Sequence, residues 1–275
     1  MNYVVLVKQV PNPEKKVGMK EDGTVDREKS EPIMNPYDAN ALEAALQLKN
    51  KYGGKVMVVS MGPPKAEEAI REAIAMGADD GILICDKRVA GSDTYATANA
   101  LARAIEKIGD YSIILCGMQA VDGDTAQVGP QVAERLNVPQ VTYAEEIEIG
   151  QDKTVRVRRI IEGGHEVFRT DYSVEKKPLL ITITSTANKP RLPSLMKMMK
   201  AKKKQITKWE LCDIEPCRDN DCCYGLKGSP TRVKKIQRIQ SNRDACKVAP
   251  GDTPEEKVEW LLGTLDSKDI HIKFS

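Results

Sequence analysis

The feature that most constrains the fold is an alternation of short apolar runs with helical patterns. Strand-like runs occupy residues 3–10, 55–61, 81–85, 111–117 and 179–184, and they read as nearly continuous apolar stretches. The intervening helical patterns end at Gly53, Gly77 and Gly109, which are typical helix stops. Continuous apolar strands separated by helices indicate parallel strands that are buried on both faces. The sequence therefore predicts an α/β fold, a mostly parallel, Rossmann-like nucleotide-binding sheet with helices on both faces.

The pattern changes after about residue 143. Polar and apolar residues then alternate, with turn signals at 150–153 and 163–164, which predicts an antiparallel meander. Beyond residue 184 the chain is polar and loop-like until "TPEEKVEWLLGTL", a short helix with Thr253 as its N-cap. We predict an α/β domain over 1–190, followed over 191–275 by a long C-terminal arm that has one short helix and would wrap a partner.

Composition excludes some classes of function. The formal net charge of +2 carries no global signature of a nucleic-acid-binding protein. No apolar run approaches the roughly 18 residues of a membrane span, and the N-terminus does not resemble a signal peptide. We expect a soluble, cytoplasmic protein with no nucleic-acid partner and no membrane insertion.

The stretch "CGMQAVDGDTAQVGPQVAERL" follows the strand predicted at 111–117. Ligands of open α/β sheets bind beyond the carboxyl ends of the strands, where this loop lies. Asp122, Asp124, Thr125 and Gln127 surround Gly123, and the helix predicted from Thr125 onward would present its N-terminus to a phosphate. The same residues could equally cap a helix with no ligand, and neither the dinucleotide fingerprint nor the Walker loop occurs.

Three other loops are predicted at the same sheet edge. They are "MNPYDANALE", with Asn35, Tyr37 and Asp38, then "SMGPP" and "GSDTYATA". Each alone is ordinary turn and cap chemistry, but their coincidence favours a nucleotide pocket. The only histidines are His165 and His271, and no catalytic triad can be read. We therefore expect a bound cofactor to perform any chemistry.

Six of the seven cysteines fall into two kinds. Cys85 and Cys116 lie in apolar runs, where a free cysteine is usually a small buried hydrophobic residue. Cys212, Cys217, Cys222 and Cys223 match neither zinc nor iron–sulfur spacings, so we expect an exposed reduced loop rather than a metal site.

A basic run at 197–204 contains five lysines and overlaps the methionine-rich stretch "SLMKMM" at 194–199. A solvated face is the default for such a run. The methionines favour protein docking, and the absence of aromatic residues disfavours nucleic-acid binding.

Several motifs together resemble the beta subunit of electron-transfer flavoprotein. They are "VLVKQVP", "MNPYDANALEAAL", "SMGPP", "AIAMGAD", "VDGDTAQVGPQVAERLNVPQVTY", "RRIIEGGHEVFR" and "LPSLMKMMKAKKK". The resemblance covers about residues 1–204 in order and does not match 209–248. It implies a heterodimer with an alpha subunit, and "VDGDTAQVGP" resembles the electron-bifurcating branch, whose beta subunit holds a second FAD.

By this resemblance the cofactor pocket comprises residues on four loops. They are Leu6, Asn35, Pro36, Tyr37, Asp38, Met61, Gly117, Met118, Gln119, Ala120, Val121, Asp122, Gly123, Asp124, Thr125, Ala126, Gln127 and Val128, with Thr94 and Thr97 as weaker candidates. The resemblance also places a partner-docking anchor at Leu195 and Met196. NADH would deliver a hydride to this FAD. One electron would pass to ferredoxin or flavodoxin and the other through the alpha-subunit FAD to a flavin dehydrogenase.

Two alternatives stay open at this stage. One is a non-bifurcating carrier in which the same pocket holds structural AMP. The other is a nucleotide-sensing regulatory protein of similar fold with no redox role. In any of these, the segment 186–247 has few apolar residues in a regular period, so we expect a partner to order it.

Overall fold

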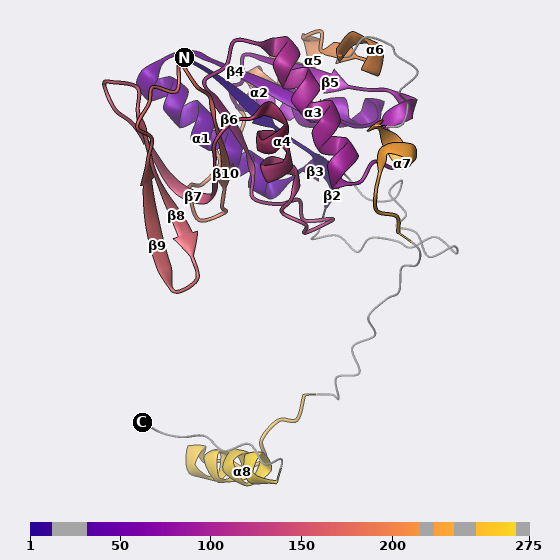
Figure 1. The fold of residues 1–275 in the computed structure, drawn as a ribbon. Coiled ribbons are helices and arrows are strands. Elements are labelled where there is room, and N and C mark those ends of the chain that lie inside the picture. Colours follow the sequence, from indigo (N-terminus) through magenta and orange to yellow (C-terminus); the bar gives the residue numbers. More distant parts are fainter. Residues whose placement is uncertain (13–31, 215–222, 234–245, 268–275) are drawn as a thin grey trace. The chain divides into compact units, whose positions relative to one another are not determined.

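The computed structural model describes residues 1–12, 32–214, 223–233 and 246–267 (Figure 1). A nine-stranded sheet organises this part of the chain. The strand order is β11-β5-β4-β1-β6-β10-β7-β8-β9. All neighbours from β11 to β7 pair in parallel, whereas β8 pairs antiparallel with β7 and β9. The predicted α/β fold with a mostly parallel sheet and an antiparallel meander is confirmed.

The strands and helices have the following bounds. The strands are β1 Asn2–Leu6, β2 Gln9–Pro11, β3 Pro32–Met34, β4 Lys55–Met61, β5 Asp80–Ile84, β6 Ile113–Gly117, β7 Gln140–Ile149, β8 Val155–Ile161, β9 Gly164–Arg169, β10 Leu179–Ile183 and β11 Thr207–Trp209. The α-helices are α1 Pro36–Tyr52, α2 Glu67–Met76, α3 Thr94–Ile108, α4 Val128–Leu136, α5 Leu195–Lys203, α6 Leu211–Ile214, α7 Gly225–Gly228 and α8 Pro254–Asp266. Short 3-10 turns lie at Pro64–Ala66 and Lys87–Val89.

Helix ends follow the local sequence signals. Gly53, Gly77 and Gly109 end α1, α2 and α3, each donating its backbone N–H to a carbonyl of the last turn. Asp93 is the N-cap of α3, and α8 begins with the capping box formed by Thr253 and Glu256. One boundary differs, because α4 begins at Val128 rather than at Thr125. Asp124 and Ala126 have positive φ values of 48° and 53°, so the chain cannot be helical there.

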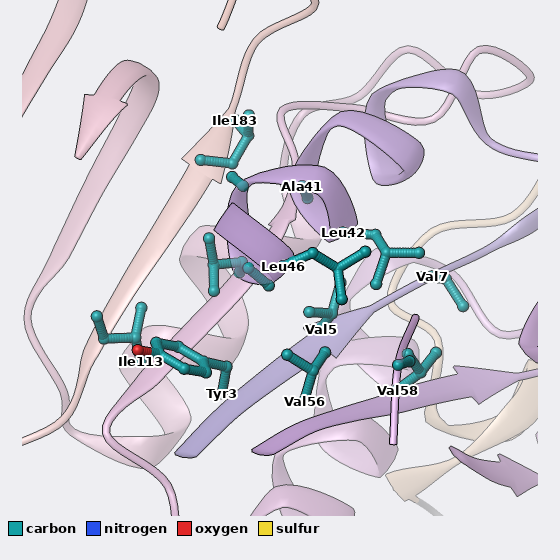
Figure 2. Packing of buried hydrophobic residues seen from close by; sticks show 14 of the residues in the cluster. Tyr3, Val5, Val7, Ala41, Leu42, Leu46, Val56, Val58, Ile113 and Ile183 are labelled. Atoms are coloured by element: carbon teal, nitrogen blue, oxygen red, sulfur yellow. The ribbon is translucent and has the colours of Figure 1, made fainter. Parts of the chain in front are cut away.

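Apolar side chains fill both faces of the sheet. On one face, alternate residues of β1 such as Tyr3 and Val5 pack against Leu42 and Leu46 of α1 (Figure 2). On the other face, Val4 and Leu6 belong to a second cluster with residues of α3 and α4. Alternation of neighbouring strand residues between the two clusters explains why the strand reads as one continuous apolar run.

The first apolar run divides into two strands. β1 ends at Leu6, and β2 pairs antiparallel with β3 in a separate two-stranded sheet. The prediction of a single strand over 3–10 is therefore wrong. The backbone N–H of Lys8 bonds to the carboxylate of Asp38 at 2.8 Å, and its carbonyl accepts from the N–H of Asn35 at 2.9 Å. These bonds draw the chain towards the start of α1 and away from the large sheet.

Part of the predicted arm folds onto the core. β11 adds to the sheet beside β5, and α5 packs against α2. Arg71 of α2 donates to the carbonyls of Lys202 and Lys204 at 2.9 Å each, and so satisfies the carboxyl end of α5. Arg191 binds the buried carboxylate of Glu43 through Nε at 2.7 Å. For this part of the chain, the expectation that only a partner orders the arm is wrong.

Contacts divide the chain into two compact units, Met1–Lys235 and Ile236–Ser275, rather than at residue 190. The second unit contains α8, which has no buried residue. Among the described residues, none of the helices has the length and apolar character needed to cross a membrane.

Candidate nucleotide site at the sheet switch point

The site lies where the strand order reverses. β1 has β4 on one side and β6 on the other, so the connections that leave these strands diverge. Such a switch point opens a crevice beyond the carboxyl ends of the two central strands. The ends of β1 and β6, the start of α1 and the loop before α4 all lie at this edge, and hydrogen bonds join them.

Asp38 connects the ends of the two central strands. Its carboxylate accepts from the backbone N–H of Lys8 at 2.8 Å and from that of Gly117 at 3.0 Å. The side chain is buried, and this loss of solvation raises its pKa to about 7, although both backbone bonds favour the charged form. Because each carboxylate oxygen already accepts a backbone hydrogen bond, Asp38 holds the ends of the two central strands together, and we assign it no direct contact with a ligand.

Asn35 holds the loop that follows β6. Its side-chain amide donates to the carbonyl of Gln119 at 2.8 Å, and its oxygen accepts from the N–H of Val121 at 3.2 Å. Asn35 is fully buried and makes no side-chain cap to α1. Its role is therefore to fix the path of residues 119–121.

Lys8, which lies between β1 and β2, contacts the same loop. Its ammonium group lies 2.6 Å from Oδ1 of Asp122, and half of its side chain is exposed. An ion pair this exposed contributes little stability on its own. It does neutralise the carboxylate of Asp122, which would otherwise repel an anionic ligand at the candidate loop. Lys8 was not predicted as a site residue, although a lysine that interrupts an apolar run is a visible signal in the sequence.

The loop backbone folds into a tight turn. The carbonyl of Ala120 accepts from the N–H groups of Gly123 at 3.2 Å and Asp124 at 2.8 Å. The side chain of Asp124 accepts from Gln119 at 2.9 Å. A Cβ atom added to Gly123 would meet no atom of the chain within 4 Å. The open space above Gly123 therefore lies on the solvent side of the turn, where a ligand backbone or phosphate could approach.

The loop leads into α4 and also contacts the start of α3. The N-cap of α4 is Gln127, which makes no side-chain cap, so the first N–H groups of α4 lack that partner. Thr94, the first residue of α3, donates its hydroxyl to Oε1 of Gln127 at 2.9 Å and accepts from Gln131 at 3.4 Å. A helix N-terminus without a side-chain cap, a glycine with open space and a nearby lysine together suit a phosphate group. Gln131 was also not predicted from sequence, because it sits one turn inside the helix.

The remaining predicted pocket residues lie on the strands and helices around the loop and the start of α4. Leu6 is buried at the end of β1, Met61 ends β4, and Thr97 lies in the first turn of α3. Tyr37 packs closely against Gly117, since a Cβ atom added to Gly117 would lie 2.6 Å from the Cβ atom of Tyr37. The ring of Tyr95 is covered by the guanidinium of Arg135, 4.2 Å from the ring centroid. Pro36, Met118, Ala120, Thr125, Ala126 and Val128 belong to the same loops and helix starts.

The other candidate side chains lie elsewhere. His165 is on β9, where its Nε2 lies 2.9 Å from Glu145. Cys116 is buried, as expected, and Cys85 is partly buried. Cys212 is disulfide-bonded, so the expectation of a reduced loop is wrong for this residue. Cys217, Cys222 and His271 lie outside the described residues. Across the part of the chain that the structure describes, no cluster of three or more His, Cys, Asp or Glu residues could hold a metal ion.

The docking residues predicted on α5 are exposed. Leu195 is 80% exposed and Met196 71%, and the carboxyl end of their helix is held by Arg71. The start of α5 therefore exposes two apolar side chains to solvent, while the end of the helix is bound to α2.

Comparison with known proteins agrees with this architecture. A family model described as the electron transfer flavoprotein domain matches residues 22–214. The chain is 44% identical over 270 residues to the electron transfer flavoprotein subunit beta of Thermoanaerobacterium thermosaccharolyticum, covering 98% of this chain and 100% of that one. It is 42% identical over 274 residues to the acryloyl-CoA reductase electron transfer subunit gamma of Anaerotignum propionicum, with coverage of 98% and 100%. It is 44% identical over 272 residues to the caffeyl-CoA reductase-Etf complex subunit CarD of Acetobacterium woodii, again with coverage of 98% and 100%.

Proposed function

The chain belongs to the electron transfer flavoprotein family as a beta subunit, and we propose that it holds FAD at the switch point of its sheet in a bifurcating heterodimer. The observation that carries this proposal is the loop from Gly117 to Gln127. Hydrogen bonds with the side chains of Asn35 and Asp38 hold the first half of this loop in place. Its second half leads into the start of α4, where no side chain caps the helix.

The chain's own residues would bind and orient the cofactor. The N–H groups at the start of α4 would receive a phosphate oxygen, and the absence of a side chain at Gly123 would allow the diphosphate to lie close to the backbone. Lys8 neutralises the carboxylate of Asp122 and so lowers its repulsion of a phosphate. These features fit the anionic part of a dinucleotide.

When bound, FAD supplies the redox chemistry, in which two electrons from NADH are divided between ferredoxin or flavodoxin and, through the alpha-subunit FAD, a flavin dehydrogenase. The resemblance of "VDGDTAQVGP" to the bifurcating branch supports this form of the proposal. The reductase complexes named for two relatives support a dehydrogenase that acts on a CoA ester as the partner.

A second candidate is the non-bifurcating carrier, in which AMP occupies the same pocket. The start of α4 would bind a single phosphate as well as a diphosphate, so the local geometry also supports this form.

One measurement separates these functions. The chain is co-expressed with its alpha subunit, the purified heterodimer is denatured, and the released nucleotides are identified and counted. Two FAD per heterodimer is the expected result. One FAD with one AMP would replace the proposal with the non-bifurcating carrier. A heterodimer without flavin would refute both and favour a nucleotide-sensing regulator.

A further inference from the structure

A segment of the arm, Tyr224–Thr231, packs over the start of α3. Tyr224 and Ser229 are buried, each 7% exposed. Gly225 lies so close to the loop before α3 that an added Cβ would be 2.2 Å from the carbonyl oxygen of Arg88. A Cβ on Gly91 would likewise lie 2.7 Å from Leu226. Packing this close fixes the segment in one position on the core of the same chain.

Asp93 is shared between this arm segment and α3. Its Oδ1 accepts from the N–H of Ala96 at 3.0 Å, which is the N-cap bond of the helix. Its Oδ2 accepts from Thr231 twice, from the backbone N–H at 3.0 Å and from the hydroxyl at 2.8 Å. The backbone N–H of Asp93 donates to the hydroxyl of Ser229 at 2.8 Å. The arm thus holds the N-cap residue on two sides.

The next residue along the chain reaches the cofactor loop. Thr94 follows Asp93 directly, and its hydroxyl donates to Gln127 at 2.9 Å. Gln127 is the last residue of the loop and the N-cap of α4. Hydrogen bonds from Thr231 to Asp93 and from Thr94 to Gln127, joined by the peptide bond between Asp93 and Thr94, therefore link the arm to the helix that would receive a phosphate.

We propose that Ser229 and Thr231 are positioning residues of the nucleotide site, which act by holding Asp93 and thereby the contact between Thr94 and Gln127. The inference rests on the proposed function for the identity of the bound nucleotide. It assigns a role to an arm segment that the motifs of the cofactor pocket leave unexplained.

The test uses the heterodimer and two variants that break the arm contact differently. Asp93→Asn keeps an N-cap acceptor for Ala96 but places an amide donor opposite the two donors of Thr231. Thr231→Val removes the hydroxyl alone. Thr231→Ser restores it, and Thr253→Val is a matched control that removes a capping hydroxyl from α8 in the other unit.

Two quantities are measured: hydrogen exchange of the backbone amides over 118–127, and the dissociation rate of the bound nucleotide. We expect both to rise roughly tenfold in the two variants, since Thr231→Val loses a hydrogen bond to a charged carboxylate and Asp93→Asn loses that carboxylate itself. Thr231→Ser and Thr253→Val should match the parent protein. In a Thr94→Val background the arm variants should add no further effect, because the connecting contact is already absent.

If amide exchange over 118–127 and nucleotide dissociation are both unchanged in Asp93→Asn and in Thr231→Val, the inference is overturned. The exchange measurement decides it whichever nucleotide is bound. The failure of the proposed function would be seen separately, as a parent heterodimer that does not contain FAD in this chain.

Discussion

Asp38 and Gly117 meet across the switch point of the sheet, where Oδ1 of the carboxylate accepts from the glycine N–H at 3.0 Å. The same contact leaves no room for a side chain on the glycine. An added Cβ would lie 2.5 Å from Oδ1 of Asp38 and 2.6 Å from Cβ of Tyr37. The start of α1 can therefore approach the end of β6 only because residue 117 is glycine.

The first prediction concerns this close approach. Gly117→Ala should lower the free energy of unfolding by about 1–3 kcal/mol, because α1 must move to accept the methyl group. Gly123→Ala is the matched control, since nothing lies within 4 Å of its added Cβ, and its effect should stay within about 0.5 kcal/mol. Urea unfolding of both variants measures the difference. Equal stability of the two would contradict the packing described at Gly117.

A second prediction concerns cofactor retention. Gly123→Val should lower FAD retention while leaving the fold intact, because the branched side chain fills the space that is open above the turn. Asp124→Ala should act in the same direction, since it removes the acceptor for Gln119 and places alanine at a positive φ. Flavin content after gel filtration is the measurement, with circular dichroism as the control for folding. A full flavin content in both variants would remove this loop from the cofactor site.

The third prediction follows from the buried carboxyl of Asp38. Burial raises its folded-state pKa to about 7 from 3.8, so between these values the folded protein holds a proton that the unfolded chain releases. The stability this group contributes is fully present below pH 3.8 and is lost as the pH rises through about 7, by at most about 1.4 kcal/mol per pH unit. Asp38→Asn should flatten this dependence.

Urea unfolding between pH 5 and pH 8 compares the two proteins. A wild-type stability that changes with pH in parallel with that of Asp38→Asn would show that this carboxyl does not titrate in the interval.

Particular residues show what could be predicted from sequence. Gly53, Gly77 and Gly109 end their helices where the periodicity stops, and parallel strands bring all the following loops to one edge. The bond between Asp38 and Gly117 could not be predicted, because 79 residues separate them and only the packed fold sets their distance. β11 could not be predicted either. Its sequence Thr-Lys-Trp has no strand periodicity, and it becomes a strand because β5 offers a free edge.

The fourth prediction concerns docking. Replacing Leu195 and Met196 by serine should raise the KM for the partner dehydrogenase several-fold, since interface energy concentrates in a few apolar anchors. Both side chains are largely exposed on α5, so their loss should alter neither the fold nor the flavin content. Val233→Ser is the control, because Val233 is 82% exposed and lies outside that helix. Steady-state electron transfer that is equally fast in all three proteins would show that α5 is not the docking element.

The last prediction separates the two parts of the arm. Residues 195–209 are held by the same chain, because Arg71 binds the end of α5 and β11 pairs with β5. In the second unit, Lys247 is exposed, and α8 leaves Val258, Leu261 and Leu262 exposed to solvent. Trypsin should therefore cut the isolated chain at Lys247 well before it cuts at the lysines of α5.

Association with an alpha subunit should slow the cleavage at Lys247, because an exposed amphipathic helix gains order when a partner covers its apolar face. Mass spectrometry of the fragments over a time course, with and without the alpha subunit, makes the comparison. If Lys247 is cut equally fast in both samples, the second unit does not bind the alpha subunit. If α5 is cut first in the isolated chain, the anchoring of that helix by Arg71 is too weak to order it without a partner.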